Sequence, residues 1–266
     1  MASVSKNIAK KLFKTLLKVF AIFVALFFAV SIMASITCYP YHGGCYVVGL
    51  RAISTEANRY VTAITAFHDK YDALPGDMEN ATELFGKGAA NGNGDDMIDA
   101  STPETFQFWR QLALAKLIEG NYTGASANTS TMQWKFGKNT PVARLTLPWE
   151  SFWEIFNPRK TGWSITTLND QNTKYAGDDI TYAGKYGLVL VFGGLSEVGQ
   201  PGAPILPPVD AWNIDTKLDD GKPATGSVRA RNWRECTTST SNTDMDGQYK
   251  LESPARSCAL YFLTGY

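Results

Sequence analysis

The sequence predicts an α+β fold, because two helical patterns precede a series of short strand-like segments. Residues 50–71 and 102–118 repeat apolar side chains at spacings of three and four, as amphipathic helices do. From about residue 122 onward, glycine, serine, threonine and asparagine become frequent, and short apolar runs replace the long periodic patterns. Because helices and strands do not alternate, we expect a mostly antiparallel sheet with a helix packed on it.

The first amphipathic helix, at residues 50–71, has one apolar stripe facing the expected core. Charged residues such as Glu56 and Asp69 fill its other faces. The Leu-Pro-Gly-Asp sequence at 74–77 ends the helix, since proline and glycine do not continue it. The stripe consists of Ile53, Ala57, Tyr60, Ile64, Phe67 and Tyr71.

The clearest strands are expected at residues 162–168, 185–193 and 257–263. Residues 186–192 are nearly all apolar, which is typical of a central strand buried on both faces. A short helix is expected at 211–219, followed by an Asp-Asp-Gly-Lys-Pro turn. Adjacent aspartates in such turns point to opposite sides, so Asp178-Asp179 and Asp219-Asp220 are interpreted as solvated turns rather than catalytic pairs.

The N-terminal region predicts a membrane anchor. Residues 19–36 are hydrophobic and uncharged, and eighteen helical residues rise about 27 Å, close to the hydrocarbon thickness of a bilayer. The lysines before this stretch predict that the N-terminus stays in the cytoplasm. They are Lys6, Lys10, Lys11, Lys14 and Lys18.

These features predict a bacterial inner-membrane protein with a single span and a periplasmic or extracellular C-terminal domain. The expected parts are a cytoplasmic basic segment (1–18), a transmembrane helix (19–37), a membrane-proximal turn (38–49) and an extracytoplasmic domain (50–266). The alternative is a secretory signal peptide cut at Ala29-Val30-Ser31, although the hydrophobic stretch is long for one. Either interpretation exports the domain.

Charge excludes one class of partner. The 25 Lys and Arg balance the 25 Asp and Glu, but five of the lysines lie in the N-terminal segment. The rest of the chain therefore carries about −5 and has no basic patch. This distribution argues against nucleic-acid binding, which depends on clustered positive charge.

Four cysteines predict two disulfides in an oxidising compartment. Three pairings are possible; Cys38–Cys45 with Cys236–Cys258 is preferred because it closes two short loops. A metal site built from Cys38, His42 and Cys45 is the alternative for the first pair, but the sequence has no Cys-x-x-Cys motif.

Two polar loops have the alternating oxygen side chains that calcium prefers. In the first loop, glycines separate the early positions, but the sixth position is Asp96 and no glutamate stands at the twelfth. A solvated turn is the alternative. The expected ligands are Asn91, Asn93, Asp95, Met97 and Asp99.

The second candidate loop contains Asn242, Asp244 and Asp246, with glycine at the sixth position. The alternative is a β-turn at Asp246-Gly247 that joins two strands. A calcium ion at either loop would have a structural role and would stiffen the loop rather than activate water.

Signals for catalysis are weak. Only His42 and His68 are present, and no nucleophile elbow, P-loop or His-Glu-x-x-His motif occurs. An aromatic cluster at residues 149–156 resembles a carbohydrate-binding surface, but its helical spacing favours a core helix. We therefore expect a protein that is not an enzyme.

Several phrases, in order, resemble type IV pilins and type II secretion pseudopilins. They are Phe-x-x-Lys-Tyr-x-x-Leu-Pro-Gly-Asp at 67–77, Asn-Gly-Asn-Gly-Asp at 91–95, Leu-Ala-x-Ala-x-Leu-Ile-x-Gly at 112–120, and Ile-Asp-x-Lys-x-Asp-Asp-Gly-x-Pro-x-x-Gly at 214–226 before a cysteine pair. The family's usual cleavage signal, Gly-Phe followed by apolar residues and a glutamate, is missing from the basic N-terminus.

The resemblance implies a pilin-like fold, in which an N-terminal helix packs on an antiparallel sheet. It also implies a non-enzymatic subunit of a type IV pilus or type II secretion-type assembly, whose partners are other pilin-like subunits, the assembly machinery and the inner membrane. The alternative function is an exported module that binds carbohydrate or protein, as an adhesin does.

Overall fold

The computed structural model describes residues 14–25, 44–99, 102–128, 133–145, 160–168, 180–195 and 201–266, without the side chains of 44–48. The chain divides into two compact units, Met1–Val47 and Val48–Tyr266. In the first unit, residues 14–25 are helical and expose apolar side chains, among them Leu16, Phe20 and Phe23. The second unit contains the sheet.

The predicted single-pass location in the inner membrane is wrong. Among the described residues, no helix combines the length and the apolar character that a membrane span needs. Helix α2 (Gly44–Tyr71), the longest in the described part of the chain, carries charged residues such as Arg51, Glu56 and Asp69 along its length. Residues 26–37 of the expected span lie outside the described residues.

The α+β class and the antiparallel sheet are confirmed. The sheet has the order β1-β2-β5-β4, with β3 added beside β2, and every pairing is antiparallel. Strand β2 is central and its residues 188–192 are buried, as the apolar run predicted. The strands are β1 (Thr161–Leu168), β2 (Gly187–Leu195), β3 (Pro201–Ala203), β4 (Val228–Arg231) and β5 (Ala259–Leu263).

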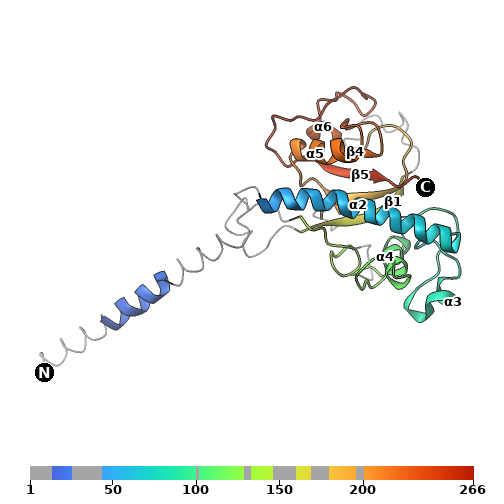
Figure 1. The fold of residues 1–266 in the computed structure, drawn as a ribbon, viewed down its shortest axis with the longest axis horizontal. Helices are drawn as coiled ribbons and strands as arrows, with labels where there is room; N and C mark the ends of the chain where they lie inside the picture. Colours follow the sequence, from blue (N-terminus) through green and yellow to red (C-terminus); the bar gives the residue numbers. More distant parts are fainter. Residues whose placement is uncertain are drawn as a thin grey trace, which may run out of the picture. The chain divides into compact units, whose positions relative to one another are not determined.

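Figure 1 shows α2 crossing the sheet, with α4 on the side of β1 and with α5 and α6 near β4. Pro208 begins α5, which suits the missing N–H of proline at the first helical turn. Helix α4 ends at Leu114, before Lys116 adopts a positive φ of 61°. The helices after α2 are α3 (Ala81–Phe85), the 3₁₀ turn η2 (Gly86–Gly88), α4 (Glu104–Leu114), α5 (Pro208–Leu218) and α6 (Trp233–Cys236).

Helix α2 begins earlier than expected, at Gly44, so the predicted turn at 38–49 is wrong for residues 44–49. Glycine is least costly near a helix end, where few helical hydrogen bonds depend on it. Gly49 also has a packing reason: a Cβ there would lie 2.8 Å from Cδ1 of Leu145. Gly49 therefore lets the segment containing Leu145 pack closely against α2, and it does not end the helix.

The core between α2 and the sheet is aromatic. Tyr60 meets Trp109 and Trp163 edge to face, with ring centroids 5.1 and 5.5 Å apart, a favoured aromatic geometry. Trp163 in turn packs against Phe192 of β2 and Phe262 of β5. This confirms the predicted apolar stripe, of which Ile53, Ile64 and Phe67 are fully buried.

Glu56 is the exception to the predicted polar face of α2, because it is buried against β1. Its carboxylate accepts hydrogen bonds from Nε1 of Trp163 (2.8 Å) and the backbone N–H of Arg144 (3.2 Å). Oε1 also lies 3.8 Å from Nε of Arg144 in an ion pair. Burial raises the pKa of Glu56, and these hydrogen bonds oppose that rise. The carboxylate therefore fastens α2 to the first strand.

Candidate functional site

The loop at 91–99 is arranged around the carboxylate of Asp77, which directly follows α2 and its Leu-Pro-Gly turn. Oδ1 of Asp77 accepts the backbone N–H of Gly94 (2.7 Å) and Asp95 (3.2 Å), and Oδ2 accepts that of Asp96 (2.8 Å). Burial raises the pKa of Asp77, while these three hydrogen bonds oppose the rise. An internal carboxylate therefore satisfies the donors at the centre of this loop.

The predicted ligands of the first calcium loop bond largely to one another and to neighbouring segments. Asn91 Oδ1 accepts the backbone N–H and the hydroxyl of Thr82. Asn93 donates to Oδ2 of Asp95 (2.9 Å), and Oδ1 of Asp95 accepts the N–H of Met97 (3.0 Å). Asp99 is exposed. The structure thus brings Asn93, Asp95 and Met97 into contact, and calcium binding here stays a prediction.

The sequence analysis did not predict that Asp77 accepts hydrogen bonds from the loop, although the Leu-Pro-Gly-Asp motif at 74–77 marks its position. Gly76 fits so tightly against α4 that a Cβ would lie 2.6 Å from the carbonyl oxygen of Glu104. Its N–H donates to Oε1 of Gln111 (2.7 Å). Gly92 packs equally closely on Asp77, since a Cβ there would lie 2.3 Å from the Asp77 Cα. Both glycines permit contacts that join three segments of the chain.

In the second predicted calcium loop, the side chain of Asp244 accepts hydrogen bonds from Thr240, four residues earlier. Asp244 Oδ2 accepts the N–H of Thr240 (2.9 Å) and its hydroxyl (3.3 Å), and the backbone hydrogen bond lowers the pKa of Asp244. Asn242 is buried, and its backbone carbonyl accepts the N–H of Ala183 (2.8 Å), whereas Asp246 is exposed. An antiparallel bridge between Thr237 and Tyr249 closes the loop. Calcium binding here also stays a prediction.

A third acidic group brings Asp215, Asp219 and Asp220 together at the C-terminal end of α5. One carboxylate oxygen from each lies within 4.8 Å of the others, which is close enough to share a metal ion. Only oxygen donors are present, as hard cations require. The interpretation of Asp219 and Asp220 as a solvated turn overlooked Asp215, although Asp215 and Asp219 have the i, i+4 spacing of one helix face.

Each carboxylate of this group also has a structural partner. Asp215 is fully buried and accepts the hydroxyl of Tyr249 (2.8 Å) and the N–H of Gly221 (3.0 Å). Asp219 accepts the N–H of Val228 (3.1 Å) at the start of β4, and Asp220 accepts the hydroxyl of Thr225 (2.6 Å). The group therefore ties α5 to the turn that follows it and to the loop containing Tyr249.

We expect the stability of the protein to fall as pH rises from 5.0 to 6.5, because Asp215 loses a proton while buried. Burial, opposed by its hydrogen bonds to Tyr249 and Gly221, raises the pKa of Asp215 from 3.8 to about 7. The folded state therefore binds this proton more tightly than the unfolded state, so its stabilisation is complete below about pH 4 and is lost by about pH 7. Over those 1.5 pH units, the loss amounts to about 2 kcal/mol.

Urea denaturation at pH 5.0 and 6.5 measures this change, with Asp215→Asn as the matched variant. The raised pKa values of Glu56, Asp77 and Glu104 act in the same direction in both proteins. The difference between the two proteins therefore isolates Asp215. An equal pH dependence in both would show that Asp215 is already ionised in the folded state at pH 5.0.

The predicted disulfide between Cys236 and Cys258 is confirmed, with Cα atoms 5.0 Å apart and both residues fully buried. It joins the end of α6 to the residue before β5. Cys38 and Cys45, and the metal alternative with His42, lie outside the part of the chain whose side chains are described.

The other candidate residues do not form a catalytic arrangement in the described part of the chain. The His68 ring contacts the ring of Tyr266, with centroids 4.9 Å apart. Asp178-Asp179 and the aromatic cluster at 149–156 lie outside the described residues.

Comparisons with models of protein families, with curated proteins and with solved structures find no match.

Proposed function

We propose that the protein is a non-enzymatic subunit of the pilin and pseudopilin kind, which assembles with other pilin-like subunits or with the machinery of a type IV pilus or type II secretion-type system. The observation that carries the proposal is α2, a helix of 28 residues with one face buried on an antiparallel sheet. A long helix on a sheet gives such a subunit a rigid surface for contact with its neighbours.

The phrases behind the family resemblance support this proposal because they pack together. The 67–77 phrase ends α2, and its Asp77 holds the loop of the 91–95 phrase through Gly94 and Asp95. Gln111, beside the 112–120 phrase, accepts the N–H of Gly76. Three segments that are separate in sequence thus form one connected substructure at the C-terminal end of α2, as a shared structural role would require.

The outer face of α2 is the contact surface in this proposal. Exposed side chains recur there at spacings of three and four, so they share one side of the helix. Three threonines on this face donate their hydroxyls to backbone carbonyls one turn earlier, so these short side chains are already held in place. Binding a partner therefore costs little side-chain entropy at these three positions. The face consists of Arg51, Thr55, Asn58, Thr62, Thr65 and Asp69.

Site-specific photo-crosslinking tests the proposal. A photoreactive phenylalanine analogue at Asn58 of the full chain, produced in bacteria that carry a type IV pilus or type II secretion system, should form an adduct with a pilin-like or machinery protein. Mass spectrometry identifies the partner. The same analogue at Lys185, which is exposed and lies before β2 rather than on α2, is the control. Adducts formed only at Lys185, or none at any of the six α2 positions, would refute the proposed contact surface.

A further inference from the structure

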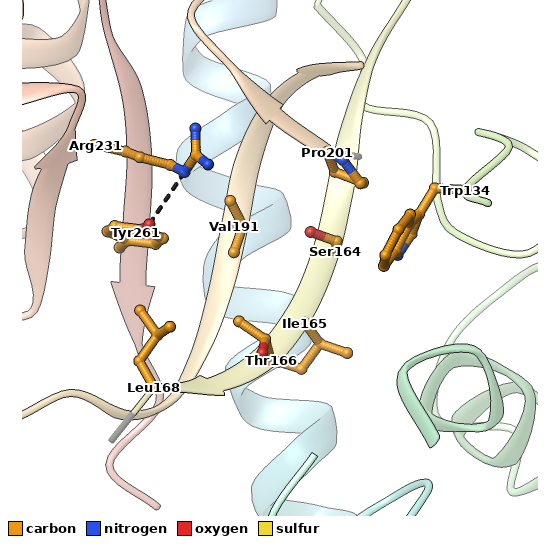
Figure 2. A pocket seen from close by; sticks show the side chains of 9 residues that line it. All are labelled: Trp134, Ser164, Ile165, Thr166, Leu168, Val191, Pro201, Arg231 and Tyr261. Carbon is orange, nitrogen blue, oxygen red and sulfur yellow. Dashed lines mark hydrogen bonds between the residues drawn. The ribbon is translucent and has the colours of Figure 1, made fainter. Parts of the chain in front are cut away.

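A second face of the sheet holds a cavity that the proposed assembly role does not use. Trp163 of β1 faces α2, so its neighbour Ser164 points to the opposite side of the sheet. The strand register places Ser164 opposite Val191, and Val191 opposite Tyr261. These side chains, with Trp134 and Pro201 at the sides, line a cavity of about 210 Å³. Figure 2 shows them on this face, with α2 behind the sheet.

Most of the cavity wall is apolar and well packed. Val191 and Tyr261 are each 4% exposed and Trp134 is 8% exposed. The Trp134 ring packs against the ring of Phe106 of α4, with centroids 5.5 Å apart. A cavity near 150 Å³ is known to accommodate a benzene ring, so this one has room for a single ring with a short polar substituent.

Arg231 brings a positive charge to this apolar wall. Its Nε donates to the hydroxyl of Tyr261 (3.0 Å), and its Nη1 donates to the carbonyl of Gly202 and to Oδ1 of Asn232. These three acceptors are neutral, and they fix the plane of the guanidinium. Figure 2 shows it extending from β4 across Tyr261 toward Val191. Among the described residues, no carboxylate pairs with Arg231 and its Nη2 makes no hydrogen bond.

We propose that this cavity binds a small organic acid, with its carboxylate on Arg231 and an aromatic or branched apolar body against Trp134 and Val191. Guanidinium groups bind carboxylates through charge-assisted hydrogen bonds, and a guanidinium held in place loses little entropy on binding. An apolar cavity with one fixed polar group is also the usual construction of a small-molecule site. The positive charge of Arg231 favours an acid over a neutral ligand. The volume of the cavity limits the apolar part of that acid to about one ring.

Arg229 provides a matched control on the same strand. Two residues before Arg231, it is on the same face of β4 and is likewise half-buried. Its guanidinium lies 4.7 Å from the centre of the Tyr186 ring, and it donates to the carbonyls of Gly226 and Lys185. Arg229 does not line the cavity. Its substitution removes an equal charge from this face while the proposed site stays intact.

Isothermal titration calorimetry of the full chain tests this site with three probes. Phenylacetate has both the ring and the carboxylate, 2-phenylethanol has the ring without the charge, and acetate has the charge without the ring. We expect saturable binding of phenylacetate with a Kd on the order of 1 mM or tighter. Binding of 2-phenylethanol and of acetate should each be at least tenfold weaker. The Arg231→Gln variant should bind phenylacetate at least tenfold more weakly, and Arg229→Gln should bind it as the unchanged protein does.

Three results would overturn the assignment: no saturable binding of phenylacetate at millimolar concentrations, equal affinity for phenylacetate and 2-phenylethanol, or an equal loss in the two arginine variants. Circular dichroism confirms that each variant is folded. If Arg231→Gln does not fold, the comparison of the three probes on the unchanged protein still decides whether a carboxylate and a ring are both required.

Discussion

Replacing Asp77 with alanine is expected to lower the free energy of unfolding by about 2 kcal/mol, because three backbone N–H groups lose a carboxylate acceptor. The N–H of Gly94 keeps the backbone carbonyl of Asp77 (3.1 Å) and that of Asp95 keeps Oδ1 of Asn93 (3.3 Å), whereas the N–H of Asp96 keeps no acceptor among the described residues. Asp77 is 1% exposed, and its carboxylate accepts hydrogen bonds from the backbone N–H groups of Gly94, Asp95 and Asp96. Leaving a buried donor unsatisfied costs about 1–3 kcal/mol, and water recovers part of that cost in a loop near the surface. Urea denaturation followed by circular dichroism measures the change.

Two further variants separate this effect from a general loss of charge in the loop. Asp77→Asn keeps the size of the side chain and one oxygen acceptor, so we expect it to lose less than half as much stability. Asp99→Ala removes an exposed carboxylate of the same loop and should change stability by no more than about 0.5 kcal/mol. If Asp77→Ala is as stable as Asp99→Ala, the Asp77 carboxylate does not organise the loop.

The same urea denaturation, with calcium or with a chelator present, tests the calcium prediction for this loop. A structural calcium ion would raise the stability of the unchanged protein by mass action, and a chelator would remove that gain. The gain should also be lost in Asp95→Ala, which removes a predicted ligand. If stability is equal with calcium and with chelator, the loop does not bind calcium and depends on internal hydrogen bonds alone.

The fold class could be predicted because it depends on periodicity within short windows. Apolar residues three and four apart predicted the buried stripe of α2, including Tyr60 and Phe67, and the apolar run at 186–192 predicted the central strand. Each signal is local, so no knowledge of distant contacts was needed. The cysteine spacing predicted the Cys236–Cys258 bond for a similar reason, since short loops close most readily.

Contacts between distant segments were not predictable in this way. Glu56 belongs to the polar residues of α2 by spacing, yet it is buried because Trp163, 107 residues later, donates to it. Asp215 was missed because its partner Tyr249 lies 34 residues away. The membrane prediction was overturned because no helix in the described part of the chain is both long enough and apolar enough to span a bilayer.

Removing the Cys236–Cys258 disulfide is expected to lower the free energy of unfolding by about 3–4 kcal/mol. The bond joins cysteines 22 residues apart, and closing a loop of that size removes roughly 3 kcal/mol of chain entropy from the unfolded state. Loss of two buried sulfur atoms adds a packing cost in Cys236→Ala/Cys258→Ala. Urea denaturation of this double variant is preferable to reduction, since a reductant would also act on Cys38 and Cys45.

A valine pair at the same two positions separates the crosslink from the packing. Valine fills more of the buried volume than alanine, so Cys236→Val/Cys258→Val should recover only the packing part of the loss. Other contacts also hold this loop: Cys258 exchanges backbone hydrogen bonds with Leu206, and Tyr249 donates to Asp215. A loss below about 1 kcal/mol in both variants would show that these contacts, rather than the covalent bond, determine the stability of the C-terminal loop.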